Sequence, residues 1–388
     1  MKEIYLDNSA TTALSAAAKT AMTGAMELYG NPSSLHAAGN RAKEMLENCR
    51  KEIAATLGVR RPEPGELIFT GGGSEGDNLA VLGTALAKPR RAGGRIIASN
   101  SEHPGVESAL QWLETRGFEV VRVPTRDGVL DLDFLRASLN EKTFLVSLMS
   151  VNNETGAVYP VAKAFSVVKT YRGDIVTHTD AVQAYLHQPL NLKTLNADLV
   201  TVSAHKIHGP KGVGALWASA PARKRRDFSP VILGGGQEYG FRSGTENTVG
   251  IAGFAAAARE GFANLSSNIE KMKSLRDLTA GLLAALPVRV NLPKGERAPH
   301  ILSVTVPGIR SETLLHALSA RGIFISNGSA CSSHAASPSA ALTAFGLSPA
   351  EIASTIRVSF CAENTEEEVC AFATVLGEET GRLVHIRS

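Results

Sequence analysis

The stretch Ser203-Ala-His-Lys-Ile-His-Gly-Pro-Lys-Gly-Val-Gly214 follows an apolar, β-prone run, Asp198-Leu-Val-Thr-Val-Ser203. Its glycines and proline cannot continue a regular strand or helix, so Lys206 is expected at the end of a buried strand. Burial lowers the pKa of an ammonium group and frees the amine to attack a carbonyl, as in a Schiff base. A strand end with a solvated lysine is the alternative, and the surrounding sequence has to decide between the two.

A second polar residue at a strand end lies upstream, in Ile175-Val-Thr-His-Thr-Asp-Ala-Val-Gln183. Pyridoxal phosphate (PLP) needs a lysine for its aldehyde and an acid beside its pyridinium nitrogen, which keeps the ring electron-poor. Two neighbouring parallel strands would supply both, one ending in Asp180 and the other in Lys206. Gln183, one helical turn after Asp180, could then reach the ring hydroxyl. An aspartate that only caps a helix is the alternative.

A glycine-rich turn, Phe69-Thr-Gly-Gly-Gly-Ser-Glu-Gly-Asp-Asn-Leu79, joins a strand-like run to the start of a helix. Glycines let the backbone approach a phosphate closely, and the N-terminus of a helix attracts an anion. No Lys-Ser/Thr pair follows at the spacing of a P-loop. The turn is therefore a candidate phosphate site of another kind.

Together these motifs resemble those of cysteine desulfurases of the NifS/IscS type, PLP enzymes of the class-V aminotransferase family with fold type I. The matching stretches run in family order from residue 5 to about residue 368. Besides the three above, they are Tyr5–Thr12, Gly30–His36, Glu102-His103, Asn152–Gly156, Gly234–Glu238, Arg242–Asn247, Gly328–Cys331 and Ile356–Ser359.

The resemblance implies a set of site residues. The catalytic residues are Lys206, Cys331 and His103, and the substrate is held by Arg357, Asn153 and Asn31. The residues implied to bind PLP are Gly73, Ser74, His103, Asn153, Asp180, Gln183, Ser203, His205, Lys206 and Thr245. Because the family's counterpart of Thr245 binds the phosphate of the partner subunit, the resemblance also implies a homodimer with shared active sites.

Two of these residues have a structural alternative. Before the resemblance is considered, the position of His103 in a strand-to-helix turn favours a surface or capping histidine. The resemblance instead stacks it on the PLP ring. Arg357 lies between Ile356 and Val358 in a strand-like run and could pair with a surface acid. The resemblance assigns it to the substrate carboxylate, which a planar guanidinium binds through two hydrogen bonds.

The cysteines differ in their surroundings. Cys331 lies in Ser326-Asn-Gly-Ser-Ala-Cys-Ser-Ser-His-Ala-Ala-Ser-Pro-Ser339, a composition that predicts an exposed loop. Such a cysteine is more readily reactive than structural. By contrast, Cys49, Cys361 and Cys370 lie in apolar patterns and are predicted to pack in the core.

The resulting hypothesis is a cysteine desulfurase that converts L-cysteine to L-alanine. Sulfur passes as a persulfide on Cys331 to an acceptor, an iron–sulfur scaffold or a tRNA-thiolation protein. One alternative is a related PLP enzyme such as a selenocysteine lyase or an aminotransferase. Another is a PLP-binding partner subunit without catalysis.

The pattern of the chain predicts an α/β fold of the aminotransferase-like type I, with a mostly parallel, seven-stranded-type sheet. Residues 15–262 are assigned to a large PLP-binding domain, and residues 1–14 and 263–388 to a smaller α+β domain that carries the Cys331 loop. Apolar periodicity predicts one long helix from Thr248 to about Leu286.

Composition narrows the class of protein. The 388 residues carry a net charge of +3, and the densest basic cluster, Arg223–Arg226, is short, so no nucleic-acid partner is expected. No apolar run approaches the roughly 20 residues of a membrane span, and Met1–Asp7 does not start a signal peptide. The four cysteines lack metal-ligand spacing, so no metal site is expected, and a reducing cytoplasm fits.

Some positions depart from the family pattern. Gly73-Ser74 stands where Ala-Thr is common, Tyr185–Gln188 replaces a Gly-Lys turn, and Phe360-Cys361 replaces a pair that often contains glycine. The sequence ends at Ser388 without the tail that housekeeping members use to dock a scaffold. The sulfur acceptor therefore stays undecided.

Overall fold

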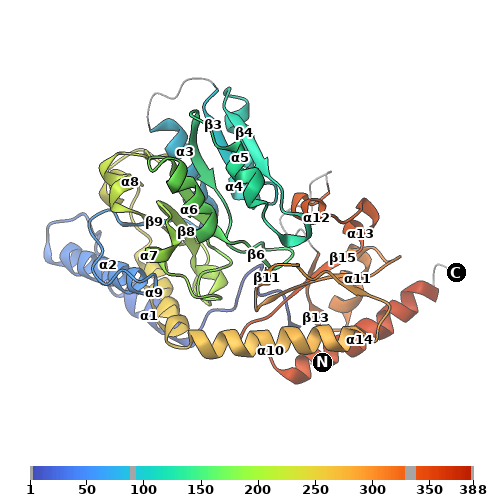
Figure 1. The fold of residues 1–388 in the computed structure, drawn as a ribbon. Helices are drawn as coiled ribbons and strands as arrows, with labels where there is room; N and C mark the ends of the chain where they lie inside the picture. Colours follow the sequence, from blue (N-terminus) through green and yellow to red (C-terminus); the bar gives the residue numbers. More distant parts are fainter. Residues whose placement is uncertain (1–2, 88–92, 328–337, 386–388) are drawn as a thin grey trace.

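The computed structural model describes residues 3–87, 93–327 and 338–385 (Figure 1). The longer helices are α1 (Ala16–Met26), α2 (Ala37–Thr56), α3 (Gly73–Leu86), α4 (Pro104–Glu114), α5 (Leu132–Ser138), α6 (Val161–Tyr171), α9 (Thr248–Ala263), α10 (Leu265–Leu283), α11 (Ser311–Ala320) and α14 (Glu366–His385). Short helices are α7 (Leu192–Leu195), α8 (Ala220–Lys224), α12 (Ala340–Phe345), α13 (Pro349–Ala353), and the 3-10 turns Arg126–Gly128, Ala204–Lys206 and Glu238–Gly240.

A seven-stranded sheet forms the centre of the larger body. Its strands are, in spatial order, β2 (Leu67–Thr70), β9 (Gly214–Ala218), β8 (Leu199–Ser203), β7 (Val176–Asp180), β5 (Thr143–Ser147), β3 (Arg95–Ser99) and β4 (Glu119–Val123). Only β9 runs antiparallel to its neighbours, and the other adjacent pairs from β8 to β4 are parallel. The prediction of a mostly parallel seven-stranded sheet is confirmed.

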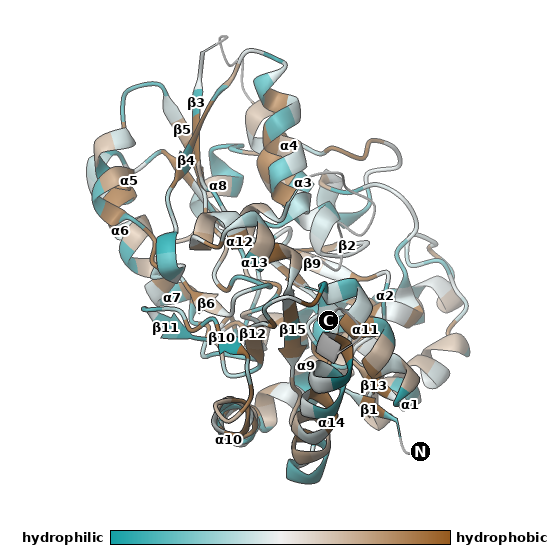
Figure 2. Ribbon diagram, turned by 90° about the vertical axis from the view of Figure 1, so that its right-hand side faces the viewer, coloured by the Kyte–Doolittle hydropathy of each residue, from teal (hydrophilic) through white to brown (hydrophobic). Residues whose placement is uncertain are grey.

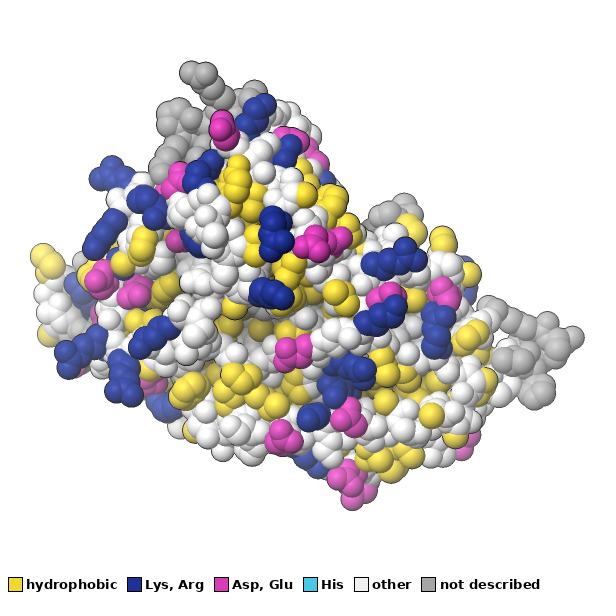
Figure 3. All heavy atoms as spheres, in the orientation of Figure 1, with side chains coloured by type: hydrophobic (Ala, Val, Ile, Leu, Met, Phe, Trp, Pro, Cys, Tyr) yellow, Lys and Arg dark blue, Asp and Glu magenta, His cyan; other side chains and the backbone are white. Residues whose placement is uncertain are grey.

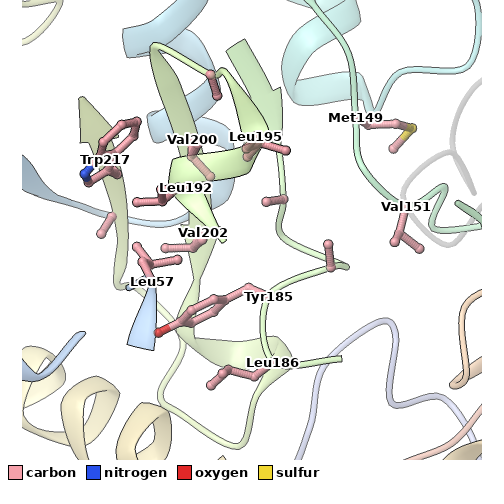
Figure 4. Close-up of a cluster of buried hydrophobic side chains, with 14 of the residues drawn as sticks. Leu57, Met149, Val151, Tyr185, Leu186, Leu192, Leu195, Val200, Val202 and Trp217 are labelled. Atoms are coloured by element: carbon pink, nitrogen blue, oxygen red, sulfur yellow. The ribbon is translucent and has the colours of Figure 1, made fainter. Parts of the chain in front are cut away.

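Helices cover both faces of this sheet because successive side chains of a strand point to opposite sides. Leu199 packs with residues of α3 and α4, whereas Val200 and Val202 pack with residues of α2, α6 and α9. Figure 4 shows part of the second face, where Val200 and Val202 lie in one apolar cluster with Leu57 and Trp217. This packing on both faces explains why β8 reads as an apolar run up to Ser203.

A smaller four-stranded antiparallel sheet lies at the other end of α10, in the order β10 (Arg289–Val290), β12 (Ile301–Thr305), β15 (Thr355–Ser359), β14 (Ser326–Asn327) (Figure 1). Two-stranded ladders join β1 (Ile4–Tyr5) to β13 (Ile323–Phe324), and β6 (Ala157–Val158) to β11 (Glu296–Arg297). An apolar cluster of its own includes Leu6, Leu275, Val304 and Phe372. The division of the chain at residue 262 stays a prediction.

Two predictions about the helices are wrong. The single helix from Thr248 to Leu286 is two helices, because Asn264 ends α9 and begins α10 with non-helical backbone angles. Its side-chain nitrogen donates to the carbonyl of Glu260 at 3.1 Å, a local bond of the kind that competes with helical ladders. Cys370 was expected in the core but is exposed on α14, whereas Cys49 and Cys361 are buried as expected.

The outer surface carries charges of both signs. Lys and Arg side chains are interspersed with Asp and Glu on the face in Figure 3, with small apolar patches between them. In Figure 2, hydrophobic segments gather among the strands near the centre, whereas hydrophilic residues are frequent along outer helices such as α14. Within the described ranges, every helix is too short or too polar to cross a membrane.

Candidate active site

The ends of β7 and β8 bring two of the predicted residues to one edge of the sheet. The strands are parallel neighbours, so Asp180 at the end of β7 lies beside the end of β8. Lys206 closes the 3-10 turn that follows β8. Both line a cavity of about 390 Å³ at the carboxyl ends of the strands, where ligands bind in open α/β sheets.

This cavity collects most of the residues predicted from the sequence. Those on its wall are Gly73, Ser74, His103, Asn153, Asp180, Gln183, His205, Lys206 and Arg357. The other residues that line it are Ser9, Ala10, Asp77, Pro104, Met149, Glu154 and Val182. Residues from both sheets and from the N-terminal segment therefore converge on one site.

The amine of Lys206 is held by backbone carbonyls. Nζ donates to the carbonyl oxygen of Ser9 at 2.5 Å and to that of Ala10 at 2.8 Å. The solvated lysine that was the alternative at this strand end is therefore wrong. Lys206 instead points into the cavity wall that the segment after β1 provides.

Two carboxyl groups and an imidazole meet at the inner end of the cavity. Polar atoms of Asp77, His103 and Asp180 all lie within 4.8 Å of one another. Burial raises the pKa of Asp180, and the nearby His103 and Lys206 lower it. Burial also lowers the pKa of His103. Its Nδ1 accepts the backbone N–H of Gly105 at 3.0 Å, so this histidine both caps α4 and faces the cavity.

Asp77 was not predicted as a site residue. It is 1% exposed, accepts a hydrogen bond from the hydroxyl of Thr201, and burial raises its pKa well above the usual range. Within the described residues its Oδ1 has no hydrogen-bond partner. The sequence places Ser74, Asp77 and Asn78 on one face of α3, at spacings of three and four residues, but does not show that this face is buried.

The glycine-rich turn opens the N-terminus of α3 toward the cavity. The residue that precedes this helix, Gly72, has a φ of 152° and no side chain to cap the first N–H groups. A Cβ on Gly73 would lie 2.8 Å from Cγ2 of Val182, which explains the departure from alanine at this position. The Ser203 hydroxyl lines an adjoining groove and has no partner among the described residues.

Arg357 lies on β15 at the opposite wall and is 2% exposed. Its Nη1 donates to the carbonyl of Asn153 at 2.8 Å, and its Nη2 to Oδ1 of Asp7 at 2.9 Å. Its Nε–H finds no acceptor in the described part of the chain. The guanidinium is buried at the cavity, and it also pairs with an acid, Asp7, whose side chain is 19% exposed, so ion pairing and a place at the cavity occur together.

Glu154, next to Asn153, is a second acid that sequence reasoning missed. Its Oε2 accepts the hydroxyl proton of Ser339 at 2.6 Å, and burial raises its pKa to about 7. Ser339 also caps α12 through the N–H of Leu342. The cavity wall is thereby joined to the first helix after the Cys331 segment.

Gln183 connects the cavity to a buried pair of histidines. Its amide nitrogen donates to the carbonyl of Ser9 at 2.9 Å, and its Oε1 lies 3.2 Å from Nε2 of His300. The rings of His300 and His187 are stacked with centroids 4.0 Å apart. Burial lowers the pKa of His187 to about 3, so both imidazoles are neutral near pH 7.

The neutral His187 predicts a pH-dependent stability. The pKa of a histidine in the unfolded chain is near 6.5, whereas burial lowers that of His187 in the folded protein. The stability that the neutral His187 gives the folded state is therefore complete above pH 6.5. It is lost as the pH falls, because the unfolded chain then binds a proton that the folded one does not. We expect the free energy of unfolding of wild type, relative to His187→Phe, to fall by about 1.4 kcal/mol per pH unit below pH 6. Urea unfolding of both proteins between pH 4 and 8 measures this difference, and parallel profiles would contradict it.

Of the predicted residues that the structure describes, Ser203 lies in the adjoining groove, and two others do not line the cavity. Thr245 and Asn31 are exposed and lie outside its lining. The side chain of Asn31 accepts the N–H of Ser33 at 2.9 Å in a local turn. Cys331 lies outside the described residues. The roles assigned to these three stay predictions.

The donors present suit one kind of ligand. Open N–H groups at α3, with Ser74 and the unpartnered Ser203 hydroxyl nearby, fit a phosphate. The buried carboxyl groups of Asp77 and Asp180 fit a cationic ring nitrogen. Lys206 lines the same cavity and offers an amine for a carbonyl group.

Comparison with known proteins gives one family. The model of the family described as "Aminotransferase class-V" matches residues 4–372. A "Cysteine desulfurase" from Nostoc sp. is 40% identical over 99% of this chain and 94% of its own. A "Cysteine desulfurase IscS" from Methanosarcina thermophila is 39% identical over 98% of this chain and 93% of its own.

Solved structures agree with the sequence relatives. A "NIFS-LIKE PROTEIN" superposes with a TM-score of 0.90 at 35% identity, covering 98% of this chain and 100% of its own. "SspA in complex with cysteine" gives a TM-score of 0.79 at 30% identity, over 93% of this chain and 100% of its own. These matches confirm the resemblance inferred from the motifs. The chain belongs to the class-V aminotransferase family.

Proposed function

We propose that the protein is a PLP-dependent cysteine desulfurase that converts L-cysteine to L-alanine and carries the sulfur on Cys331. The observation that carries the proposal is that Lys206, Asp180 and Arg357 line one cavity. An amine, an acid and a guanidinium are the groups that a PLP enzyme acting on an amino acid requires. The names of the relatives, cysteine desulfurase above all, favour cysteine as the amino acid.

Different residues of the cavity would bind different parts of PLP. Ser74, Ser203, His205 and the N-terminus of α3 would hold the phosphate. Asp180 would accept the N–H of the pyridinium nitrogen, with Asp77 behind it, and His103 would lie against the ring. When bound, PLP supplies an aldehyde for the substrate amine and a ring that accepts electrons from the α-carbon.

The protein's own groups then hold the substrate and move its protons. Arg357 binds the carboxylate of L-cysteine, with Asn153 beside it. The Lys206 amine, released from the two carbonyls that hold it, takes the α-proton and later returns a proton to carbon.

Sulfur leaves the substrate by attack of the Cys331 thiolate. A sulfur–sulfur bond forms as the carbon–sulfur bond breaks, and the carbon takes both electrons of that bond and then a proton. L-alanine departs, and Cys331 keeps a persulfide. An acceptor protein of iron–sulfur cluster assembly or tRNA thiolation would take this sulfur in the cytoplasm.

We further propose that the active unit is a homodimer. The side chain of Thr245 is exposed and does not line the cavity of its own subunit. The residues before it include Leu233, an apolar side chain that is 78% exposed. A second subunit that covers this segment would bring Thr245 to the phosphate of its neighbour. A sedimentation measurement of the PLP-loaded protein tests this assembly.

The function is tested by quantifying both products. Purified protein is incubated with PLP, L-cysteine and a thiol reductant, and alanine and sulfide are measured. Equal amounts of the two support a desulfurase. Transamination of a keto acid without sulfide would indicate an aminotransferase, and a strong preference for L-selenocysteine would indicate a selenocysteine lyase.

Arg357→Lys is expected to raise the KM for L-cysteine by about 100-fold, because an ammonium group cannot form the paired hydrogen bonds of a guanidinium. The affinity for PLP should stay within about twofold, since one buried cation replaces another. Steady-state kinetics measure the first effect and fluorescence titration the second. Arg289→Lys, at a half-exposed arginine on β10, is the matched control. An unchanged KM in Arg357→Lys would remove this residue from substrate binding.

A further inference from the structure

The carbonyl oxygen of Ser9 is shared by two residues of the cavity. It accepts a hydrogen bond from Nζ of Lys206 and another from Nε2 of Gln183. Ser9 is itself fixed, because its N–H donates to Oγ of Ser359 at 2.8 Å. The Lys206 amine and the Gln183 amide therefore share one acceptor, which a hydrogen bond to Ser359 holds in place.

These contacts also determine which way the Gln183 amide is turned. A carbonyl oxygen only accepts, so the NH₂ group of Gln183 must face Ser9 and its oxygen must face His300. An amide oxygen also only accepts, so Nε2 of His300 must carry the proton. The second hydrogen of the Gln183 NH₂ group stays available to the cavity that this residue lines.

His300 is built to remain in this neutral form. It is 1% exposed, and its Nδ1 has no partner within the described chain, which fits an unprotonated nitrogen. Burial lowers its pKa, as do the charges of Arg357, Lys206 and Arg276 and the proximity of His187. The stacked ring of His187 packs against one face of the imidazole and limits its rotation.

His187 lies in the turn Tyr185–Gln188 that departs from the family pattern. Leu186 in this turn has a φ of 58°, in the left-handed region that favours glycine. The turn therefore retains a strained backbone while placing an imidazole against His300. The stacking of His187 on His300 is a physical reason for the unusual sequence of this turn, and the reaction steps proposed above do not involve it.

We propose that His300, packed on His187, is a positioning residue that fixes the Gln183 amide with its NH₂ group toward Ser9 and the bound cofactor. This positioning role rests on the proposed function, because the group that the Gln183 amide would contact is PLP. Without the His300 donor, only the Ser9 carbonyl holds the Gln183 amide in this orientation, so the amide oxygen turns toward the ring hydroxyl more often. A donor to the ionised ring oxygen would then be lost.

His300→Phe keeps a stacked ring but removes the donor. We expect this variant to bind PLP about three- to tenfold more weakly, as expected for the loss of one buried hydrogen bond. The pH midpoint of the bound-cofactor absorbance should rise by roughly half a unit, since a hydrogen-bond donor favours the ionised oxygen. Fluorescence titration and absorbance between pH 6 and 9 measure the two effects without substrate.

Three further variants separate this role from a merely structural one. His300→Gln restores an N–H donor at similar reach and should return both readouts toward wild type. His187→Phe keeps the stack and the Gln183–His300 hydrogen bond but removes the hydrogen bonds of His187 to the backbone of Tyr185 and Gln183, so its effect on both readouts should be smaller than that of His300→Phe. In a Gln183→Leu background, His300→Phe should have no further effect, because the group that it orients is absent.

The outcomes for this proposal and for the proposed function are distinct. Wild type that binds PLP but releases no alanine from L-cysteine overturns the desulfurase and leaves the positioning role standing. Readouts that are equal in wild type and His300→Phe overturn the positioning role. An equal effect of His300→Phe in the Gln183→Leu background also overturns it, because the histidine would then act independently of Gln183.

Discussion

Lys206→Ala is expected to lower the rate of alanine formation from L-cysteine by at least about 1,000-fold, since it removes the group that moves the α-proton. It should also abolish the absorbance band that PLP acquires when a lysine amine holds its aldehyde. The cavity itself should persist, because the Ser9 and Ala10 segment has other anchors, among them the bond from the Ser9 N–H to Ser359.

Turnover and absorbance spectra of the purified variant measure both effects. Lys224→Ala, at an exposed lysine on α8, is the matched control and should behave as wild type. A Lys206→Ala protein that keeps the absorbance band would show that another lysine holds the cofactor. The same folded circular dichroism spectrum in all three proteins excludes unfolding as the cause.

Cys331→Ser is expected to lower sulfide and alanine formation by at least about 100-fold while PLP still binds. A serine hydroxyl is not ionised near neutral pH and cannot attack sulfur as a thiolate does. The prediction separates the two halves of the reaction, since the proton transfers by Lys206 do not need Cys331. Exchange of the α-proton of L-cysteine with solvent deuterium should therefore persist in the variant.

The matched control for this variant is Cys370→Ser, because Cys370 is an exposed cysteine on α14. Mass spectrometry of wild type after brief exposure to L-cysteine should find the extra sulfur on Cys331. Sulfide release that survives in Cys331→Ser would mean that the sulfur leaves the substrate by elimination, without a protein persulfide.

Much of the site could be predicted because its residues stand where strands end. Asp180 and Lys206 each follow a β-type run, and parallel neighbours place such ends at the same edge of a sheet. The resemblance added Arg357, whose strand belongs to a different sheet. No local sequence pattern indicates that β15 lies near the end of β8, so the residues alone could not have predicted that Arg357 and Lys206 line one cavity.

Other features depend on tertiary contacts that no local pattern announces. Asp77 reads as a polar residue on an outer helix, yet the packing of α3 on the sheet buries it beside Asp180. His187 and His300 stack because the turn after β7 lies beside the residue that precedes β12, a contact between segments far apart in the sequence. In α14, the apolar run around Cys370 predicted burial, but the helix turns this side chain outward.

The ion pair between Asp7 and Arg357 joins residues 350 positions apart, at the two ends of the described chain. During translation, Ser74, Asp180 and Lys206 emerge well before the guanidinium that completes the cavity. A nascent chain that has not reached residue 357 holds the groups for the cofactor but not the one for the substrate carboxylate. Synthesis from the N-terminus therefore makes the groups proposed to hold the cofactor available before the one proposed to bind the substrate carboxylate, and amino-acid binding as proposed requires strand β15 to be in place.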